Sequence, residues 1–383
     1  MKMKEMKEAV KFVWTVEFWR MGVLWTLSLL SSYFHFFFFS PPRNSKSSYP
    51  RTCPPHNSTS TSTIRTPPVC VITGASSGLG AAAAFDLSME GFYVVLAGRS
   101  TQALLETMTD IKTRNKDAYL IVFHLDISSF QSIFKFQASL QQWLLDSNLH
   151  CSIQLLINNA GILATSSRIT AEGYDEMLGT NYIGAFSLTK ALLPLLENSL
   201  VPSRIVNVTS FTHRNDDWIK LFPSVYCAKM DKDTVAGKCF LSLKQYPCAY
   251  IYQYSKLCLL LFSYELHRQL ALMGELHHVS VIAADPGVVE TNIMREVPLC
   301  ISRVTFIVLK LLGLLQSSKK GVSSILDAAL APPEISGVYF FGGKGRTINS
   351  SALSYNTKLA KELWTTSCDL FSESQLASNK TST

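Results

Sequence analysis

One stretch of the chain, from Val69 to Gly80, restricts the fold more than any other. The apolar, β-branched run VCVIT is followed by the turn GASSGLG and then by AAAAFDLSMEG, whose composition favours a helix. Glycines let a backbone come close to a pyrophosphate, and the free N–H groups of a helix N-terminus attract an anion. A glycine-rich turn alone is an ordinary loop, but this one lies between a strand and a helix. The sequence therefore predicts a dinucleotide-binding unit in an α/β domain.

Further apolar runs follow this unit and alternate with segments of helical composition. We expect strands in FYVVLAGRS, YLIVFHLDIS, SIQLLINNAG, SRIVNVTSF, VSVIAADPGVVET and SGVYFFGGKG. Strands that alternate with helices form a mostly parallel sheet with helices on both faces. The predicted fold class is α/β, with a single doubly wound Rossmann-type sheet flanked by helices and an N-terminal membrane-anchor helix.

The second expected strand ends at Gly98-Arg99, and this strand end predicts the cofactor. NAD-specific folds carry Asp or Glu here to bind the ribose 2′-hydroxyl, whereas a guanidinium suits a 2′-phosphate. No acidic residue stands at this position. Arg99 therefore favours NADP(H) over NAD(H), and the alternative reading is an exposed arginine of an ordinary loop.

A tyrosine and a lysine at Y-x-x-x-K spacing, Tyr252 and Lys256, supply groups for proton transfer. On a helix this spacing places both side chains on one face, one turn apart. A free tyrosine has a pKa of about 10, and a nearby ammonium group lowers it. Tyr254 stands two residues before Lys256 and points elsewhere, so we assign Tyr252. The alternative is an aromatic helix face beside a solvated lysine.

The motifs of the chain, taken in order, resemble those of the short-chain dehydrogenase/reductase family. They are T-G-x-x-x-G-x-G at 73–80, N-N-A-G at 158–161, Y-x-x-x-K at 252–256 and P-G-x-x-x-T at 286–291. The chain resembles in particular the retinol-dehydrogenase-like members and the group called dehydrogenase/reductase SDR family member on chromosome X. The resemblance implies a nicotinamide cofactor, hydride transfer between an alcohol and a carbonyl, and homo-oligomers.

The same resemblance assigns roles to individual residues. Tyr252 is the acid and base, Lys256 tunes it and binds the nicotinamide ribose, Ser210 binds the substrate oxygen, and Asn181 organises a proton-relay water. Thr209 adjoins Ser210 at the same strand end, and an N-cap is the alternative role of Asn181. The residues expected to hold the cofactor are Thr73, Gly74, Ser76, Ser77, Gly78, Leu79, Gly80, Arg99, Asp126, Ile127, Asn159, Ala160, Gly161, Tyr252, Lys256, Pro286, Gly287 and Thr291.

The first 68 residues differ in composition from the rest of the chain. A basic segment, 1–20, precedes an apolar stretch, 21–39, whose length is close to the roughly 20 residues that cross a bilayer. This stretch exceeds the apolar region of a cleaved signal peptide, which is the alternative. Segment 40–68, rich in Ser, Thr and Pro, predicts a flexible linker. We expect an anchor in the endoplasmic reticulum membrane, and the same composition keeps plastid import as the alternative.

Charge and cysteine usage exclude two classes of site. The net charge is +7, but residues 1–68 hold nine Lys/Arg and three Glu, a net of +6, which leaves +1 for the rest. A nucleic-acid binder carries its basic patch on the folded domain, so we expect no nucleic-acid partner. The nine cysteines form no C-x-x-C pair and no cluster with histidine. We expect free thiols in a reducing compartment and no metal site.

The sequence departs from the family pattern in two places. Ser210 and Tyr252 are farther apart than in most members, so part of 212–250 is an insertion, either a lid or a surface loop. The apolar stretch 299–315 contains Arg303 and Lys310, which favours an amphipathic helix over the substrate cleft. With these segments included, we expect a catalytic domain over 69–371 and a disordered tail over 372–383.

The expected function is that of an NADP(H)-dependent oxidoreductase acting on a lipophilic alcohol or carbonyl. The anchor and the apolar cover indicate a retinoid, steroid, fatty or isoprenoid substrate. A rival function is that of a non-catalytic NADP(H)-binding sensor or scaffold at a membrane. The complete catalytic set argues against the rival, because a sensor has no physical need for Tyr252 and Lys256 together.

Overall fold

The computed structural model describes residues 11–39, 48–54, 66–215, 229–241, 243–274 and 279–381. Its main feature is a seven-stranded sheet in the order β3-β2-β1-β4-β5-β6-β9, with every neighbouring pair parallel. Each strand falls in an apolar run predicted from the sequence, so the doubly wound α/β fold is confirmed. The strands are β1 Val69–Thr73, β2 Tyr93–Gly98, β3 Tyr119–His124, β4 Leu155–Asn158, β5 Ser203–Val208, β6 Val279–Asp285 and β9 Val338–Phe341.

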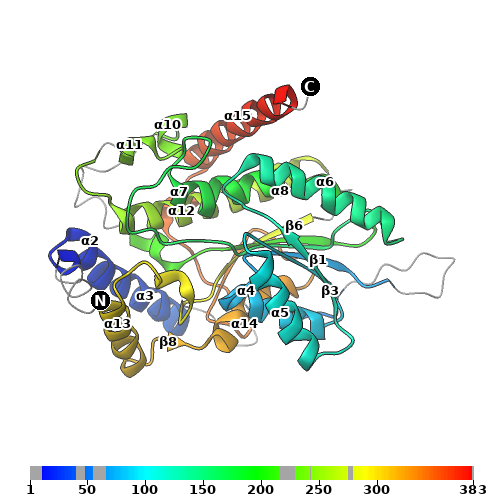
Figure 1. Ribbon diagram of the computed structural model, residues 1–383. Coiled ribbons are helices and arrows are strands. Elements are labelled where there is room, and N and C mark those ends of the chain that lie inside the picture. Colours follow the sequence, from blue (N-terminus) through cyan, green and yellow to red (C-terminus); the bar gives the residue numbers. More distant parts are fainter. Residues whose placement is uncertain are drawn as a thin grey trace.

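Helices cover both faces of this sheet, as Figure 1 shows. One face carries α4 Gly78–Met89, α5 Thr101–Arg114 and α14 Ser318–Ala329. The other carries α6 Phe130–Asp146, α8 Gly184–Glu197 and α12 Cys248–Leu272, with α15 Thr357–Thr381 packed on α12. Each face buries its own apolar core. Strands covered on both faces need continuous apolar runs rather than alternation, and VCVIT is such a run.

The strand order reverses at β1, which has β2 on one side and β4 on the other. Thr73 lies opposite Ala97 of β2, and Ile72 lies opposite Ile157 of β4. Open α/β sheets bind ligands outside the carboxyl ends of the strands at such a switch point. The turn after β1 and the residues after β4 therefore meet where a cofactor is expected.

The N-terminal apolar stretch is a helix with one side packed on the α/β domain. Its parts are α2 Val16–Trp19, the π-helical η1 Arg20–Leu24, α3 Trp25–Phe34 and the π-helical η2 His35–Phe39. The helix Val16–Phe38 is long and apolar enough to cross a membrane, with a mean hydropathy of 1.3, which makes it a candidate membrane anchor. Leu29 and Phe36 nevertheless pack with Phe341 of β9, and Arg214 donates to the Ser32 hydroxyl at 2.8 Å.

Part of the expected flexible linker is hydrogen-bonded to the α/β domain. The Tyr49 N–H donates to the Gly345 carbonyl at 2.8 Å, and the Arg51 guanidinium lies 2.7 Å from the Asp327 carboxylate. These bonds join residues 48–54 to the far edge of the sheet. For most of 40–68 the linker prediction lies outside the described residues.

The C-terminal segment also differs from the prediction. Helix α15 continues to Thr381 through the stretch expected to be a disordered tail. No glycine or proline interrupts residues 357–381, so nothing in the sequence stops the helix. An exposed ion pair between Lys232 and Glu373 adds a contact there.

The remaining elements are short and lie around the carboxyl edge of the sheet. They are α7 Glu176–Leu178, η3 Gly179–Ile183, η4 Phe211–Asn215, α10 Lys232–Val235, α11 Lys238–Leu241, β7 Val288–Val289, η6 Asn292–Met294, α13 Leu299–Leu311, β8 Leu315–Gln316 and η7 Ala352–Tyr355. Helix α10 of the insertion packs on α15, and the Thr366 hydroxyl donates to the Met230 carbonyl at 2.5 Å. Residues 216–228 of the insertion lie outside the described ranges. The interpretation of the insertion as a lid depends on these residues.

Candidate active site

Three glycines shape the turn that follows β1. Gly74 and Gly78 have φ angles of +66° and +56°, in the left-handed region that favours glycine. A Cβ atom on Gly80 would lie 2.3 Å from the Gly74 carbonyl oxygen, so only glycine fits there without a shift of the backbone. The turn therefore brings the N-terminus of α4 close to the end of β1. Side chains on these glycines would fill the cradle that a pyrophosphate needs.

Hydrogen bonds between β1 and the loop after β4 hold this cradle open. The Thr73 hydroxyl accepts from the backbone N–H groups of Asn159 and Ala160, both at 3.0 Å. The Asn159 side-chain amide donates in return to the Thr73 carbonyl at 2.9 Å. The side chains of Thr73 and Asn159, two residues that the sequence assigned to the cofactor, therefore also fix the backbone at the switch point of the sheet.

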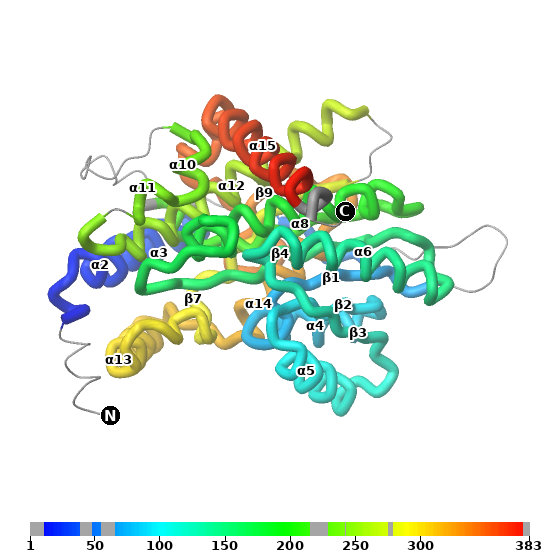
Figure 2. The backbone as a smooth tube through the Cα atoms, turned by 45° about the horizontal axis from the view of Figure 1, so that its top comes forward, coloured from blue at the N-terminus to red at the C-terminus, as the bar shows by residue number. Residues whose placement is uncertain are grey.

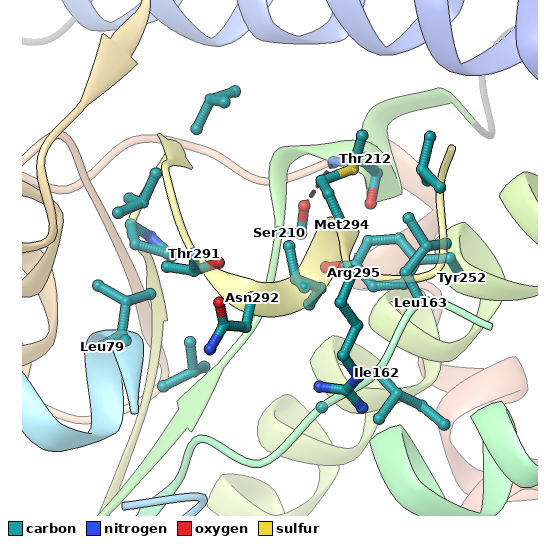
Figure 3. A pocket seen from close by; sticks show the side chains of 18 of the residues that line it. Leu79, Ile162, Leu163, Ser210, Thr212, Tyr252, Thr291, Asn292, Met294 and Arg295 are labelled. Carbon is teal, nitrogen blue, oxygen red and sulfur yellow. Dashed lines mark hydrogen bonds between the residues drawn. The ribbon is translucent and has the colours of Figure 1, made fainter. Parts of the chain in front are cut away.

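The cradle opens into a cavity of about 740 Å³ that runs from the glycine turn to the N-terminal helix. All of the predicted cofactor residues line it except Gly80, which lies behind the turn. Ser210 and Tyr252 also line it, and Figure 3 shows them beside the loop that carries Thr291 and Met294. The structure therefore brings together residues that are far apart in the sequence.

Tyr252 and Lys256 lie on α12 beside the end of β5. The Lys256 ammonium is 5.8 Å from the centre of the Tyr252 ring and donates to the Val208 carbonyl at 3.0 Å. Ser210, which is 8% exposed, is a hydrogen-bond partner of Tyr252. The phenol, the ammonium and the hydroxyl therefore form one buried cluster at the carboxyl end of the sheet.

Two competing residues point away from this cluster. The Thr209 hydroxyl donates to the Lys256 backbone carbonyl at 3.2 Å, so it faces α12. The Tyr254 hydroxyl donates to the Met230 sulfur at 3.1 Å, under the described part of the insertion. These contacts support the choice of Ser210 and Tyr252.

Asn181 lies in the π-helical η3, behind Gly161. Its Oδ1 accepts from the Ile162 N–H at 2.8 Å, and its Nδ2 donates to the Ile162 carbonyl at 2.9 Å. The cap of α7 is Asp175, whose carboxylate accepts from backbone N–H groups. The alternative reading of Asn181 as an N-cap is therefore wrong. A Cβ on Gly161 would lie 3.4 Å from the Asn181 Oδ1 and 3.6 Å from the Lys256 Nζ, so both groups lie near Gly161.

Burial dominates the electrostatics of the cluster. It raises the pKa of Tyr252, a change that the nearby Asp285 carboxylate increases and the Ser210 hydrogen bond opposes. Burial also lowers the pKa of Lys256 to about 8 against the attraction of Asp285. Lys256 is not among the groups that shift the Tyr252 pKa here, so the lowering expected from the sequence is not seen. The phenol is protonated at neutral pH.

Comparison with known proteins identifies the family. Residues 68–228 match the family model described as short chain dehydrogenase. Polyprenol dehydrogenase of Homo sapiens is 32% identical over 310 residues, which cover 79% of this chain and 84% of that protein. Retinol dehydrogenase 12 of Homo sapiens is 30% identical over 352 residues, which cover 91% of this chain and 98% of that protein. The chain belongs to the short-chain dehydrogenase family.

A solved structure supports the same fold. An uncharacterized protein from Mycobacterium paratuberculosis aligns with a TM-score of 0.58 and 27% identity, over 80% of this chain and 93% of that one. The present chain is a retinol-dehydrogenase-like member of the short-chain dehydrogenase family, and the fold of this family binds a nicotinamide cofactor.

Two further predicted cofactor residues lie at the ends of β2 and β3. Arg99 lines the cavity with its side chain 52% exposed, 3.8 Å from the Glu176 carboxylate. The Asp126 carboxylate accepts from the Ser128 N–H at 3.0 Å and from the Ser128 hydroxyl at 2.7 Å. The P-G-x-x-x-T loop of this dehydrogenase lies against the glycine turn, because a Cβ on Gly78 would be 3.3 Å from the Thr291 methyl group.

Sequence reasoning missed the side chains that line the substrate end of the cavity. The residues concerned are Met21, Trp25, Ile162, Leu163, Met294 and Ile301. Those after the N-N-A-G and P-G-x-x-x-T motifs follow predicted site residues, so their position along the chain was a usable signal. Met21 and Trp25 had no such signal, because a membrane anchor explained their apolar character completely. Asp285 was missed although it immediately precedes Pro286.

Proposed function

We propose that this chain is an NADP(H)-dependent oxidoreductase that interconverts an alcohol and a carbonyl on a lipophilic substrate. The observation that carries the proposal is the buried cluster of Tyr252, Lys256 and Ser210 at the end of a glycine-shaped cradle. A non-catalytic sensor needs the cradle but not the cluster.

The residues of the cradle fit a nicotinamide dinucleotide. The glycine turn and the α4 N-terminus would hold the pyrophosphate, Arg99 would bind the 2′-phosphate and Asp126 would lie on the adenine side. Lys256 would bind the nicotinamide ribose, and the loop from Pro286 to Thr291 would cover the nicotinamide. When bound, the nicotinamide supplies the hydride for reduction and accepts it for oxidation.

The protein's own groups handle the proton and the oxygen. In reduction, Ser210 donates a hydrogen bond to the substrate carbonyl oxygen, and Tyr252 gives its proton to that oxygen as the C–H bond forms. The raised pKa of Tyr252 keeps the phenol protonated and ready to act as this acid. The Lys256 ammonium stabilises the phenolate that remains. Asn181 positions the water through which the phenolate regains its proton.

The test is reduction of a panel of hydrophobic aldehydes with NADPH by the purified full-length chain. We expect Tyr252→Phe to lower kcat by about 10²- to 10⁴-fold, the usual contribution of general acid catalysis. Tyr254→Phe is the matched control, because its hydroxyl contacts Met230 outside the cavity. It should keep most of the activity. Tight NADPH binding without any turnover by the wild-type chain would support the sensor instead.

The substrate class follows from the apolar lining of the cavity and from the two relatives, whose names specify polyprenol and retinol. We propose a retinoid, steroid, fatty or isoprenoid substrate, and a site of action at the endoplasmic reticulum membrane with the catalytic domain on a reducing side. Cell fractionation of the tagged full-length chain checks this location, and recovery with plastids would support the alternative.

A further inference from the structure

Two helices that are far apart in the sequence frame the substrate end of the cavity. From the N-terminal helix, Met21, Trp25 and Leu29 line it, and from α13, Ile301, Thr305 and Leu309 do so. Figures 1 and 2 show these helices side by side at one end of the molecule, and Leu309 packs against the core cluster that contains Leu29. The N-terminal helix is therefore a wall of the active site as well as an apolar anchor.

Trp25 makes the most direct contact between this wall and the chemistry. Its ring centre is 5.4 Å from that of the catalytic Tyr252, with the two planes tilted by 43°. The helix is also fixed at both ends, because Glu17 accepts from the Ala249 N–H at 2.8 Å and Tyr33 accepts from the Gln316 side chain at 2.9 Å. The helix therefore lies along the domain and is bonded to it near both ends.

The outer sides of the two helices are apolar as well. More than half of the exposed large hydrophobic side chains in the described residues lie on them. On the N-terminal stretch they are Trp14, Val16, Trp19, Val23, Leu27, Leu30, Phe34, Phe37 and Phe38, and on α13 and the residue after it they are Leu299, Val304, Ile307, Val308, Leu311 and Leu312. Exposed apolar side chains gathered on two neighbouring helices in this way are typical of an interaction site.

The charges on this surface favour a lipid bilayer as the partner. Residues 299–316 contain no acidic residue, and Arg303 and Lys310 are exposed there. Glu17 is the acidic residue in the described part of the N-terminal stretch. It is 5% exposed and forms an ion pair with Arg20. Apolar side chains with basic neighbours suit the interface of a membrane with anionic headgroups.

The mouth of the cavity lies on the same surface. Val304 of α13 lines the cavity and is 60% exposed. Val308 of the same helix and Leu312, the residue after it, also line the cavity and are exposed. A cavity of about 740 Å³ is in the range that encloses a drug-sized ligand, and the dinucleotide cradle takes part of this one. A long lipid therefore fits only with its reacting end inside and its tail outside.

We propose that the N-terminal helix and α13 lie together in the surface of a bilayer and that the substrate is a long-chain lipid. Its reacting end enters sideways from the membrane between the two helices while its tail stays among the acyl chains. This inference rests on the proposed function and adds the route and the length of the substrate.

The experiment compares two aldehydes with the same reacting group and the full-length chain in vesicles of phosphatidylcholine and phosphatidylserine. One is a long-chain isoprenoid aldehyde dissolved in the vesicles, and the other is its short water-soluble homologue. The variant is Leu311→Asp on α13, which puts a charge on the outer apolar surface at a leucine that is 82% exposed and does not line the cavity. We expect it to lower kcat/KM for the long aldehyde by about ten-fold or more, because a charge among acyl chains is costly, and to leave the short aldehyde nearly unchanged.

The matched control is Leu145→Asp on α6, where the leucine is 55% exposed and does not line the cavity. It should affect neither aldehyde. The inference is overturned if Leu311→Asp changes the kcat/KM of both aldehydes equally or of neither. Absence of NADPH-dependent turnover of both aldehydes by the wild-type chain would instead refute the proposed function, so the two failures are distinguishable.

Discussion

Asp285, at the end of β6, shows how one buried residue connects the catalytic cluster to the edge of the sheet. Its carboxylate accepts from the Gly287 N–H at 2.7 Å and from the Tyr339 hydroxyl on β9. Burial raises its pKa to about 6, although these hydrogen bonds and the charges of Arg214 and Lys256 oppose the change. The loop that begins at Pro286 is thereby fixed to the sheet.

The raised pKa of Asp285 predicts a pH dependence of stability. Its folded pKa of about 6 exceeds the unfolded value of about 3.9, so the protonated form is favoured in the fold. Its stabilising contribution is complete below about pH 4 and is lost as the pH rises through about 6. We expect wild type to lose on the order of 2 kcal/mol more unfolding free energy over this range than Asp285→Asn. Urea unfolding of the detergent-solubilised proteins at about pH 4 and about pH 6 measures both losses of unfolding free energy. Equal losses in wild type and Asp285→Asn would contradict the assignment of the raised pKa to Asp285.

Gly80 offers a test of the glycine cradle. A Cβ there meets the Gly74 carbonyl oxygen at 2.3 Å, so Gly80→Ala should displace the turn, cost about 1–3 kcal/mol of stability and weaken NADPH binding. Gly91→Ala is the control, because it has a φ of +86° but nothing within 4 Å of the added Cβ. It should lose some stability through backbone strain and keep its NADPH affinity. Calorimetry of NADPH binding separates the two, and equal affinities would argue against the cradle.

Arg99 tests the cofactor preference. We expect Arg99→Ala to raise the KM for NADPH by about ten-fold or more, the scale of a lost charge-assisted hydrogen bond, with little change for NADH. Arg114→Ala is a suitable control, because Arg114 is half exposed, pairs with Asp110 and lies outside the cavity lining. An unchanged ratio of NADPH to NADH efficiency in Arg99→Ala would show that the 2′-phosphate role is wrong.

At the scale of elements, α15 packs on the core with one side along part of its length and is exposed near its end. Leu363 is fully buried in the core cluster that also contains residues of α12 and α8, whereas Leu376 is 64% exposed. We expect Leu363→Ala to destabilise the fold by about 2–5 kcal/mol and Leu376→Ala to have almost no effect. Chemical denaturation of both variants checks this. Similar losses in the two would mean that the end of α15 contributes to the core.

At the scale of the whole molecule, the cavity combines the glycine turn, α12, the loop after β6, α13 and the N-terminal helix. A ligand that contacts all of them stabilises the folded chain through mass action. NADPH at about a hundred times its Kd should add about 2.7 kcal/mol and raise the unfolding temperature by about 5 °C. NADH at the same concentration should give a smaller shift. Thermal unfolding followed by tryptophan fluorescence measures both, and the absence of a shift with NADPH would count against the cofactor site.

The sequence by itself determined the sheet, the glycine turn and the choice of Tyr252 and Lys256. These features depend on local patterns, because a strand, a turn and one helical turn each involve only a few neighbouring residues. The choice of Ser210 over Thr209 was also a prediction from the sequence, made from its position after the strand, and the hydrogen bonds of the two residues support it.

Only the tertiary structure decided the place of the N-terminal helix and the surroundings of the catalytic pair. An apolar helix is equally satisfied by lipid and by protein, so composition predicted an anchor and gave no sign that Trp25 would lie against Tyr252. The pKa values of Tyr252 and Lys256 likewise depend on burial and on Asp285, which comes from a different strand. Burial and charge act through space, and that neighbourhood exists only after the chain has folded.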